Sequence, residues 1–286
     1  MKYAFIKAHE ADFSVEKMCR VLKVGRSGYY VWRGRVKSQR EQANEALLKE
    51  IKTVFEQSRK TYGSPRIHAQ LHQNGLSCGR HRVARLMHEH QLVAKKVVKH
   101  HPQTTKQREG AKVAPNLLNR EFTATQPNKK WVSDFTYIDT AEGWLYLAVI
   151  LDLYSRKVVG WAMSDNMDAN LVEAAWQMAV QQRQPSADLL HHSDRGSQYT
   201  SETYLDQLTK QQCQISMSRT GNCYDNAVIE SFFATLKAEC ADLPFASRAQ
   251  ARTTIFEFIE VWYNRQRLHS TLGYLSPHLF EQLSRL

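Results

Sequence analysis

The sequence lacks a hydrophobic run of the roughly 18 residues that a membrane helix needs, and its first twelve residues hold no apolar segment typical of a secretory signal. Its five cysteines, at positions 19, 78, 213, 223 and 240, form no Cys-x-x-Cys pair. The adjacent histidine pairs at 100–101 and 191–192 have no partner ligands at helical spacing. These absences argue against a membrane protein, a disulfide framework and a zinc site, and they favour reduced thiols in the cytoplasm.

Acidic residues are scarce in the first 120 positions, which hold 25 lysines and arginines against 9 acidic residues. The remaining positions hold 14 against 19, within a chain of net charge +11. This asymmetry indicates an N-terminal part that meets a polyanion and a C-terminal part with another task. The alternative is a basic surface that serves only solubility. A chain of 286 residues, 42% of them hydrophobic, has room for two domains and a sizeable core.

Apolar residues recur at helical spacing through the first third of the chain, in segments that begin near Ser14, Ser27, Gln39, Ser64 and Ser77. We expect Ser14, Ser64 and Ser77 to cap their helices. In the last of these helices Arg80, Arg82 and Arg85 are expected to face outward. A helix, a short glycine-containing turn and a basic helix form a helix-turn-helix pattern, whose second helix enters the major groove of DNA. Residues 1–93 are therefore predicted to be a helical DNA-binding region.

Basic residues crowd the stretch after this region, which is poor in apolar residues and is punctuated by Pro115 and Pro127. Lys95 and Lys96 open it. The composition predicts a basic linker over residues 94–126, extended or only partly ordered, that can follow DNA phosphates.

From residue 131 the hydrophobic pattern alternates, which indicates strands. We expect a strand over 131–138, a nearly continuous apolar strand over 144–153 and a third over 157–164. The segments expected after them are helix 169–183, strand 189–193, helix 201–211, strand 215–218 and a helix that carries Glu230. The order predicts an α/β fold, with a mixed five-stranded sheet flanked by helices. We place this core at 127–240 and a helical C-terminal extension at 241–286.

Three acidic residues lie in distinctive motifs: Asp134 in WVSDFTY, Asp194 in HSDRGSQY and Glu230 in DNAVIESFF. Asp134 belongs to the first strand, Asp194 follows a neighbouring strand, and Glu230 borders the buried stripe of a helix, with Lys237 two turns further along the same face. Mg²⁺ prefers carboxylate oxygens, and two such ions can drive phosphodiester chemistry. Each residue alone could equally be a cap, turn or surface carboxylate. Gly196 makes a turn role a real competitor for Asp194.

The three motifs resemble the catalytic blocks of DDE transposases, in the bacterial insertion-sequence family most similar to retroviral integrases. The resemblance also includes residues 21–32, 62–67 and 262–277 and so spans nearly the whole chain. It implies a ribonuclease-H-like core, a catalytic and metal-binding triad of Asp134, Asp194 and Glu230, and two Mg²⁺ or Mn²⁺ ions per active site. It further implies that Lys237 contacts DNA.

The resemblance also implies partners. These are double-stranded DNA, as terminal inverted repeats and as target, further copies of the chain on that DNA, and the product of an upstream reading frame, separate or fused by frameshifting. The chain has no sustained heptads, which fits the second-frame product alone. We expect a bacterial cytoplasmic protein that associates with the nucleoid when bound to DNA.

Two other functions remain open at this point. A non-catalytic DNA-binding regulator derived from such an element would need no acidic triad, because carboxylates beside phosphates do not help binding. A structure-processing nuclease on the same fold would need neither the long basic N-terminal region nor the C-terminal block. An assay of strand joining as well as cleavage would separate the three.

Overall fold

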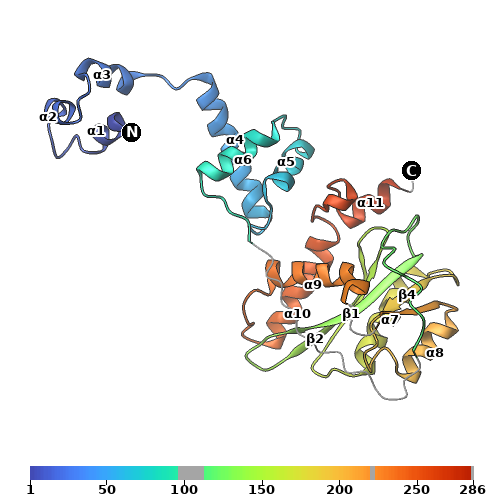
Figure 1. Ribbon diagram of the computed structural model, residues 1–286. Helices are drawn as coiled ribbons and strands as arrows, with labels where there is room; N and C mark the ends of the chain where they lie inside the picture. Colours follow the sequence, from blue (N-terminus) through green and yellow to red (C-terminus); the bar gives the residue numbers. More distant parts are fainter. Residues whose placement is uncertain (96–112, 220–222, 285–286) are drawn as a thin grey trace. The chain divides into compact units, whose positions relative to one another are not determined.

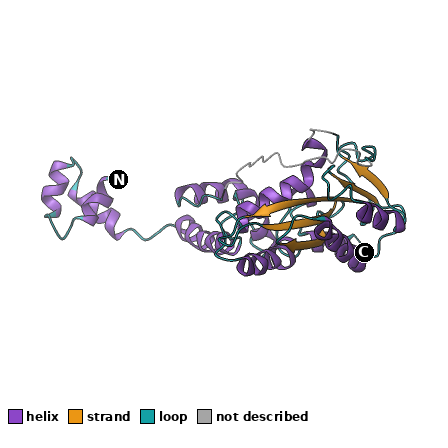
Figure 2. Ribbon diagram, turned by 90° about the horizontal axis from the view of Figure 1, so that it is seen from below, coloured by secondary structure: helices purple, strands orange, loops and turns teal. Residues whose placement is uncertain are grey.

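The computed structural model describes residues 1–95, 113–219 and 223–284 (Figures 1 and 2). The chain divides into two compact units, Met1–Thr53 and Val54–Leu286. Among the described residues, no helix combines the length and the apolar character that a membrane span requires.

The first unit is built from three short helices, α1 (Lys2–Ala8), α2 (Val15–Val21) and α3 (Arg26–Gly34). Ile6, Met18, Cys19 and Tyr29 form its core, to which each helix contributes. The Ser14 hydroxyl accepts a hydrogen bond from the Lys17 amide, which confirms the expected cap of α2. The sequence pattern did not indicate α1, because a helix of two turns shows too little periodicity.

Helix α4 (Gln39–Gln57) crosses the division, and α5 (Ser64–Gln73) and α6 (Arg80–Glu89) follow in the second unit. The predicted caps of α5 and α6 were wrong. Gly63 caps α5, because the Ile67 amide closes the first turn on the Gly63 carbonyl. Gly79 caps α6 in the same way, through the Val83 amide. Because the glycines occupy the cap positions, Ser64 and Ser77 do not play the expected role, and neither helix has a side-chain cap.

The second unit holds a five-stranded sheet of order β3-β2-β1-β4-β5 (Figure 1). Its strands are β1 (Lys130–Ile138), β2 (Leu145–Asp152), β3 (Val158–Ser164), β4 (Leu190–Ser193) and β5 (Gln214–Met217). Strand β2 runs antiparallel to its neighbours β1 and β3, whereas β4 runs parallel to β1 and β5 parallel to β4. The predicted mixed sheet is therefore confirmed.

Helices α7 (Ala169–Arg183) and α8 (Glu202–Lys210) build a core with one face of the sheet. Trp131 of β1, Ile150 of β2 and Trp176 of α7 belong to this cluster. Gly160 allows the close approach of α7 to β3, because a Cβ at this position would lie only 2.6 Å from the Ala179 Cβ. Side chains alternate between the two faces along a strand. Asp134 is three residues after Trp131 and therefore points to the opposite face of the sheet.

Helix α9 (Ala227–Cys240), entered through the 3₁₀ turn η1 (Cys223–Asn226), packs with the C-terminal segment. That segment contains α10 (Arg248–Phe256), the π-helical η2 (Glu257–Tyr263), the 3₁₀ turn η3 (Ser270–Leu272) and α11 (Pro277–Leu283). The ring of Phe232 on α9 meets that of Tyr263 edge-on, with 4.8 Å between centroids. This aromatic packing fixes α9 within the second unit.

Part of the predicted linker is ordered along β5. The Met217 amide donates to the Pro115 carbonyl, and the Ser216 hydroxyl accepts from the amides of Leu117 and Leu118. Leu118 is buried. Residues 96–112 of the predicted linker lie outside the described part of the chain.

Candidate active site

Asp134 and Asp194 occupy equivalent positions along the neighbouring strands β1 and β4. In the parallel ladder between β1 and β4, Val132 pairs with His192. Asp134 lies two residues beyond the first partner, still within β1, and Asp194 lies two residues beyond the second, just past the end of β4. Because residues along parallel strands advance in step, this pairing places both carboxylates near the carboxyl end of β4.

Backbone amides orient both aspartates. The Phe135 amide donates to Asp134 Oδ1 at 2.8 Å, and the Gly196 amide donates to Asp194 Oδ1 at 2.9 Å. The second bond makes Asp194 part of the turn that the sequence suggested as a competing role. A turn role and a ligand role are compatible, because a carboxylate has two oxygens and about four acceptor sites.

Glu230 reaches the site from the first turn of α9. Hydrogen bonds of two neighbouring residues, Asn226 and Asp225, hold the start of α9 in place. The Asn226 side-chain amide donates to the Ser133 carbonyl, at 3.4 Å, beside Asp134. Asp225, which is fully buried, accepts from Arg219, Arg120 and the Asn116 amide. Burial alone would raise the pKa of Asp225, but the bonds from Arg219 and Arg120 hold it well below its usual range.

The three acidic residues lie near enough to one another for their charges to interact. The pKa of Asp134 is raised well above its ordinary value, first by burial, then by the negative charge of Asp194 and, more weakly, by that of Glu230. The bond from the Phe135 amide opposes this only in part. Three carboxylates whose charges repel one another at a half-buried position form the donor set that Mg²⁺ and Mn²⁺ prefer. The residues therefore fit a divalent metal.

Lys237 lies on the same helix as Glu230. Seven residues bring a side chain back to within about 20° of the starting direction and about 10 Å further along the axis. Lys237 is half-buried, and burial lowers its pKa. The geometry agrees with the face that the sequence predicted for it.

The other residues predicted to contact DNA have different settings. On α6, Arg80 and Arg85 are exposed and Arg82 is half-buried, and Arg85 pairs with Glu89 at 2.8 Å. Lys95 is exposed and pairs with Asp242 at 2.9 Å, so part of its charge is already compensated. Lys96 lies outside the described residues.

A basic pocket of about 290 Å³ was missed by the sequence reasoning. Arg66, Arg156, Arg267 and His269 line it, together with a side of α9 that carries Val228 and Ser231 rather than Glu230. Arg156 Nη1 and His269 Nε2 are buried and have no hydrogen-bond partner within the described part of the chain. Arg267, in contrast, binds Glu239 at 2.7 Å. The sequence signals were the membership of Arg66 in the block at 62–67 and of Arg267 and His269 in the closing block at 262–277.

Comparison with models of known protein families identifies the class of protein. Models of the integrase core domain match residues 124–223 and 211–277, and a model of an HTH-like domain matches residues 42–100. The first two matches include the sheet, α9 and the three acidic residues, and the third contains α5 and α6. The fold and the matches define a polynucleotidyl transferase with an integrase core and an all-helical HTH-like region, which confirms the predicted fold class.

Two curated relatives place the chain more closely. It is 45% identical to the transposase InsF for insertion sequence IS3A of Escherichia coli (strain K12), over 98% of both chains. It is 46% identical to an uncharacterized 31 kDa protein of insertion element IS600 from Shigella sonnei, over 93% of this chain and 97% of the relative. The chain therefore belongs to the family of IS3-type DDE transposases, as the resemblance predicted.

Solved structures add a weaker likeness. The catalytic core domain of BIV integrase aligns with 55% of this chain and 96% of its own, at 17% identity and a TM-score of 0.41. The family assignment rests on the curated relatives and the family models.

Proposed function

We propose that this transposase cleaves and rejoins DNA at the ends of a bacterial insertion sequence, and that Asp134, Asp194 and Glu230 hold two Mg²⁺ or Mn²⁺ ions for that purpose. The observation that carries the proposal is the register of β1 and β4, which places Asp134 and Asp194 at equivalent positions, with the charges of both Asp194 and Glu230 acting on Asp134. Because three carboxylates at one point repel one another, a divalent cation stabilises their charged forms.

Two such ions, when bound, activate the attacking water or 3′-hydroxyl and stabilise the charge on the leaving oxygen. The chain itself orients the ligands. The amides of Phe135 and Gly196 fix the planes of the two aspartates, and the anchored start of α9 presents Glu230. Preorganised ligands of this kind contribute to the rate because they need no rearrangement during the reaction.

Several cations in the second unit supply the DNA contacts in this proposal. Lys237 binds a phosphate next to the acidic site, and α6 enters the major groove with Arg80, Arg82 and Arg85. Lys95 and Lys96 bind further phosphates of the DNA. The basic pocket takes one further phosphate, which would satisfy Arg156 Nη1 and His269 Nε2.

The DNA partners are the terminal inverted repeats and the target. Copies of the chain assemble on that DNA, because two ends must be held together for joining. The upstream-frame product, as a partner or a fusion, belongs to the same proposal and would supply further end recognition. The alternative of a catalytically inactive regulator finds no support in the site, since all three acidic residues of the triad are present.

A strand-joining assay tests the proposal. A labelled, pre-cut inverted-repeat end is incubated with the full chain, Mg²⁺ and a supercoiled target, so that joining does not depend on the first cut. The proposed transposase moves the label into the target. A nuclease would shorten the labelled strand without joining, and a regulator would only retain the DNA on a filter. Either of these results would overturn the proposal.

A further inference from the structure

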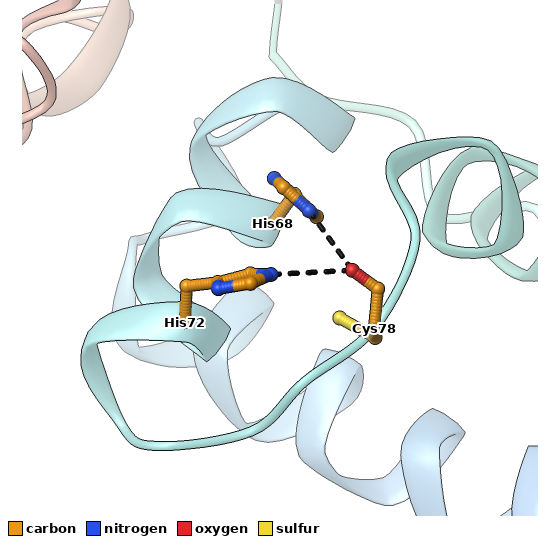
Figure 3. Close-up of side chains that lie close together, drawn as sticks. All are labelled: His68, His72 and Cys78. Carbon is orange, nitrogen blue, oxygen red and sulfur yellow. Dashed lines mark hydrogen bonds between the residues drawn. The ribbon is translucent and has the colours of Figure 1, made fainter.

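Two histidines and a cysteine of the second unit converge at the turn between α5 and α6 (Figure 3). His68 and His72 lie one helical turn apart on α5, with ring centroids 4.6 Å from each other. Cys78 comes just before the Gly79 cap of α6. One ligand atom from each of the three side chains lies within 4.8 Å of the others.

The local fold explains the convergence. Ile67 and Leu71 are buried, so the residues that follow each of them stand together on the flank of α5. Gly75, at a φ of +83°, lets the chain reverse after α5, and the Leu76 amide binds the Leu71 carbonyl. The returning chain brings Cys78 opposite both imidazoles. His68 Nε2 lies 3.0 Å and His72 Nε2 3.3 Å from the Cys78 carbonyl oxygen.

The donor set selects a class of metal. Two imidazole nitrogens and one thiolate suit Zn²⁺, whereas Mg²⁺ prefers oxygen. Zn–N bonds of about 2.0 Å and a Zn–S bond of about 2.3 Å place tetrahedral ligand atoms about 3.3–3.6 Å apart. The three side chains can reach that spacing by small rotations, because His72 is exposed and His68 and Cys78 are only half-buried.

We propose that His68, His72 and Cys78 bind one Zn²⁺ ion, which ties the end of α5 to the start of α6. Water completes the coordination as the fourth ligand. The metal replaces the two bonds to the Cys78 carbonyl with stronger links across the turn. The expectation that the cysteines belong to no zinc site is revised by this proposal, because that expectation compared only adjacent histidines and Cys-x-x-Cys spacing.

The consequence concerns α6. Cys78 stands two residues before Arg80, so a metal on Cys78 fixes the direction in which α6 leaves the turn. The metal site is independent of the acidic triad and stands whether or not strand transfer is observed. A metal at this site would hold α5 and α6 together in addition to the packing of their side chains.

Cobalt provides the test, because Co²⁺ occupies zinc sites and reports its ligands by absorption. The full chain is stripped with a chelator under reducing conditions and titrated with Co²⁺. We expect one strongly absorbing tetrahedral Co²⁺ per chain, with a thiolate-to-cobalt band, and its displacement by Zn²⁺. Co²⁺ at the acidic triad would give neither feature, since that site offers oxygen ligands alone.

Two variants test the ligands. Cys78→Ser should abolish the thiolate band, and His72→Gln, at an exposed position, should weaken Co²⁺ binding by at least roughly tenfold without affecting folding. The matched controls are His81→Gln, at an exposed histidine on α6, and Cys213→Ser, and both should bind Co²⁺ as the parent does. Absence of the band in the parent chain, or its persistence in Cys78→Ser, would overturn the proposal.

Discussion

Asp134 and Asp194 stand at equal offsets from one pair in the parallel ladder, Val132 of β1 and His192 of β4. Strand pairing thus brings together two acidic residues that are sixty positions apart in the sequence. The relative positions of these two aspartates come from backbone hydrogen bonds between the strands, and the third acidic residue, Glu230, comes from α9, whose start is tied to Ser133. The candidate site therefore depends on the sheet and on one anchored helix.

The first prediction is that Asp134→Asn, Asp194→Asn and Glu230→Gln each abolish both cleavage and joining. Each change keeps the shape of the side chain and removes one anionic ligand, so losses of about a thousandfold or more are expected in both steps. The measurement is the rate of each step on pre-cut and uncut ends. Binding of DNA should survive.

Asp139→Asn is the matched control, because Asp139 is exposed and comes one residue after β1. Asp152 would be a poor control, since it is buried and accepts bonds from the amides of Asn128 and Tyr154. Robust cleavage by Glu230→Gln, or inactivation by Asp139→Asn in a folded protein, would contradict the assignment.

The second prediction concerns pH. The pKa of Asp134 is raised by burial, Asp194 and Glu230, so a proton competes with the metal for this carboxylate at pH values above its ordinary range. Lowering the pH adds the proton and removes the ligand. The Mg²⁺ concentration for half-maximal joining should therefore rise as the pH falls from neutrality toward the ordinary range of an aspartate carboxyl group. A Mg²⁺ requirement that is constant over this interval would contradict the electrostatic account of the site.

The third prediction concerns Lys237. Lys237→Ala should slow cleavage by about tenfold to a hundredfold through poorer positioning of the DNA, because a half-buried ammonium holds a phosphate more firmly than a solvated one. Lys237→Arg keeps the charge and should restore much of the rate. The KM for the DNA end should change more than the Mg²⁺ requirement. A shift in the Mg²⁺ requirement alone would refute the assigned role.

The sequence predicted the sheet because alternation and long apolar runs are local signals. The positions of Asp134 within the first strand and of Asp194 just after a neighbouring strand followed from the same signals. The burial and the hydrogen bonds of His191 and His192 could not be predicted from local patterns. Both are buried in β4, and His192 bonds to Ser216 and Ser218. Burial lowers the pKa of His191 to about 3 and that of His192 to about 4, so both remain neutral and structural.

Contacts between segments far apart in the sequence could not be predicted from it. Arg66 donates to the carbonyl of Leu268, 202 residues away, and Cys78 was not paired with any histidine. Such pairs depend on how whole elements pack, which no short window of sequence contains. The helix caps failed for a smaller reason. Serine is favoured at caps, but Gly63 and Gly79 also adopt the extended backbone that a cap needs, so composition alone did not decide between neighbours.

The last prediction tests the basic pocket. If it takes a DNA phosphate, Arg156→Gln should weaken binding of all DNA sequences alike, because phosphate contacts carry no sequence information. It should also reduce the slope of log K against log salt by about 0.9, the change expected for one lost contact. Glutamine can keep the left-handed backbone of position 156 about as well as arginine, so the fold should persist. The control is Lys210→Gln, which removes one exposed charge at the end of α8, outside the pocket. An unchanged slope for Arg156→Gln, or an equal loss for Lys210→Gln, would show that the pocket binds no phosphate of the DNA.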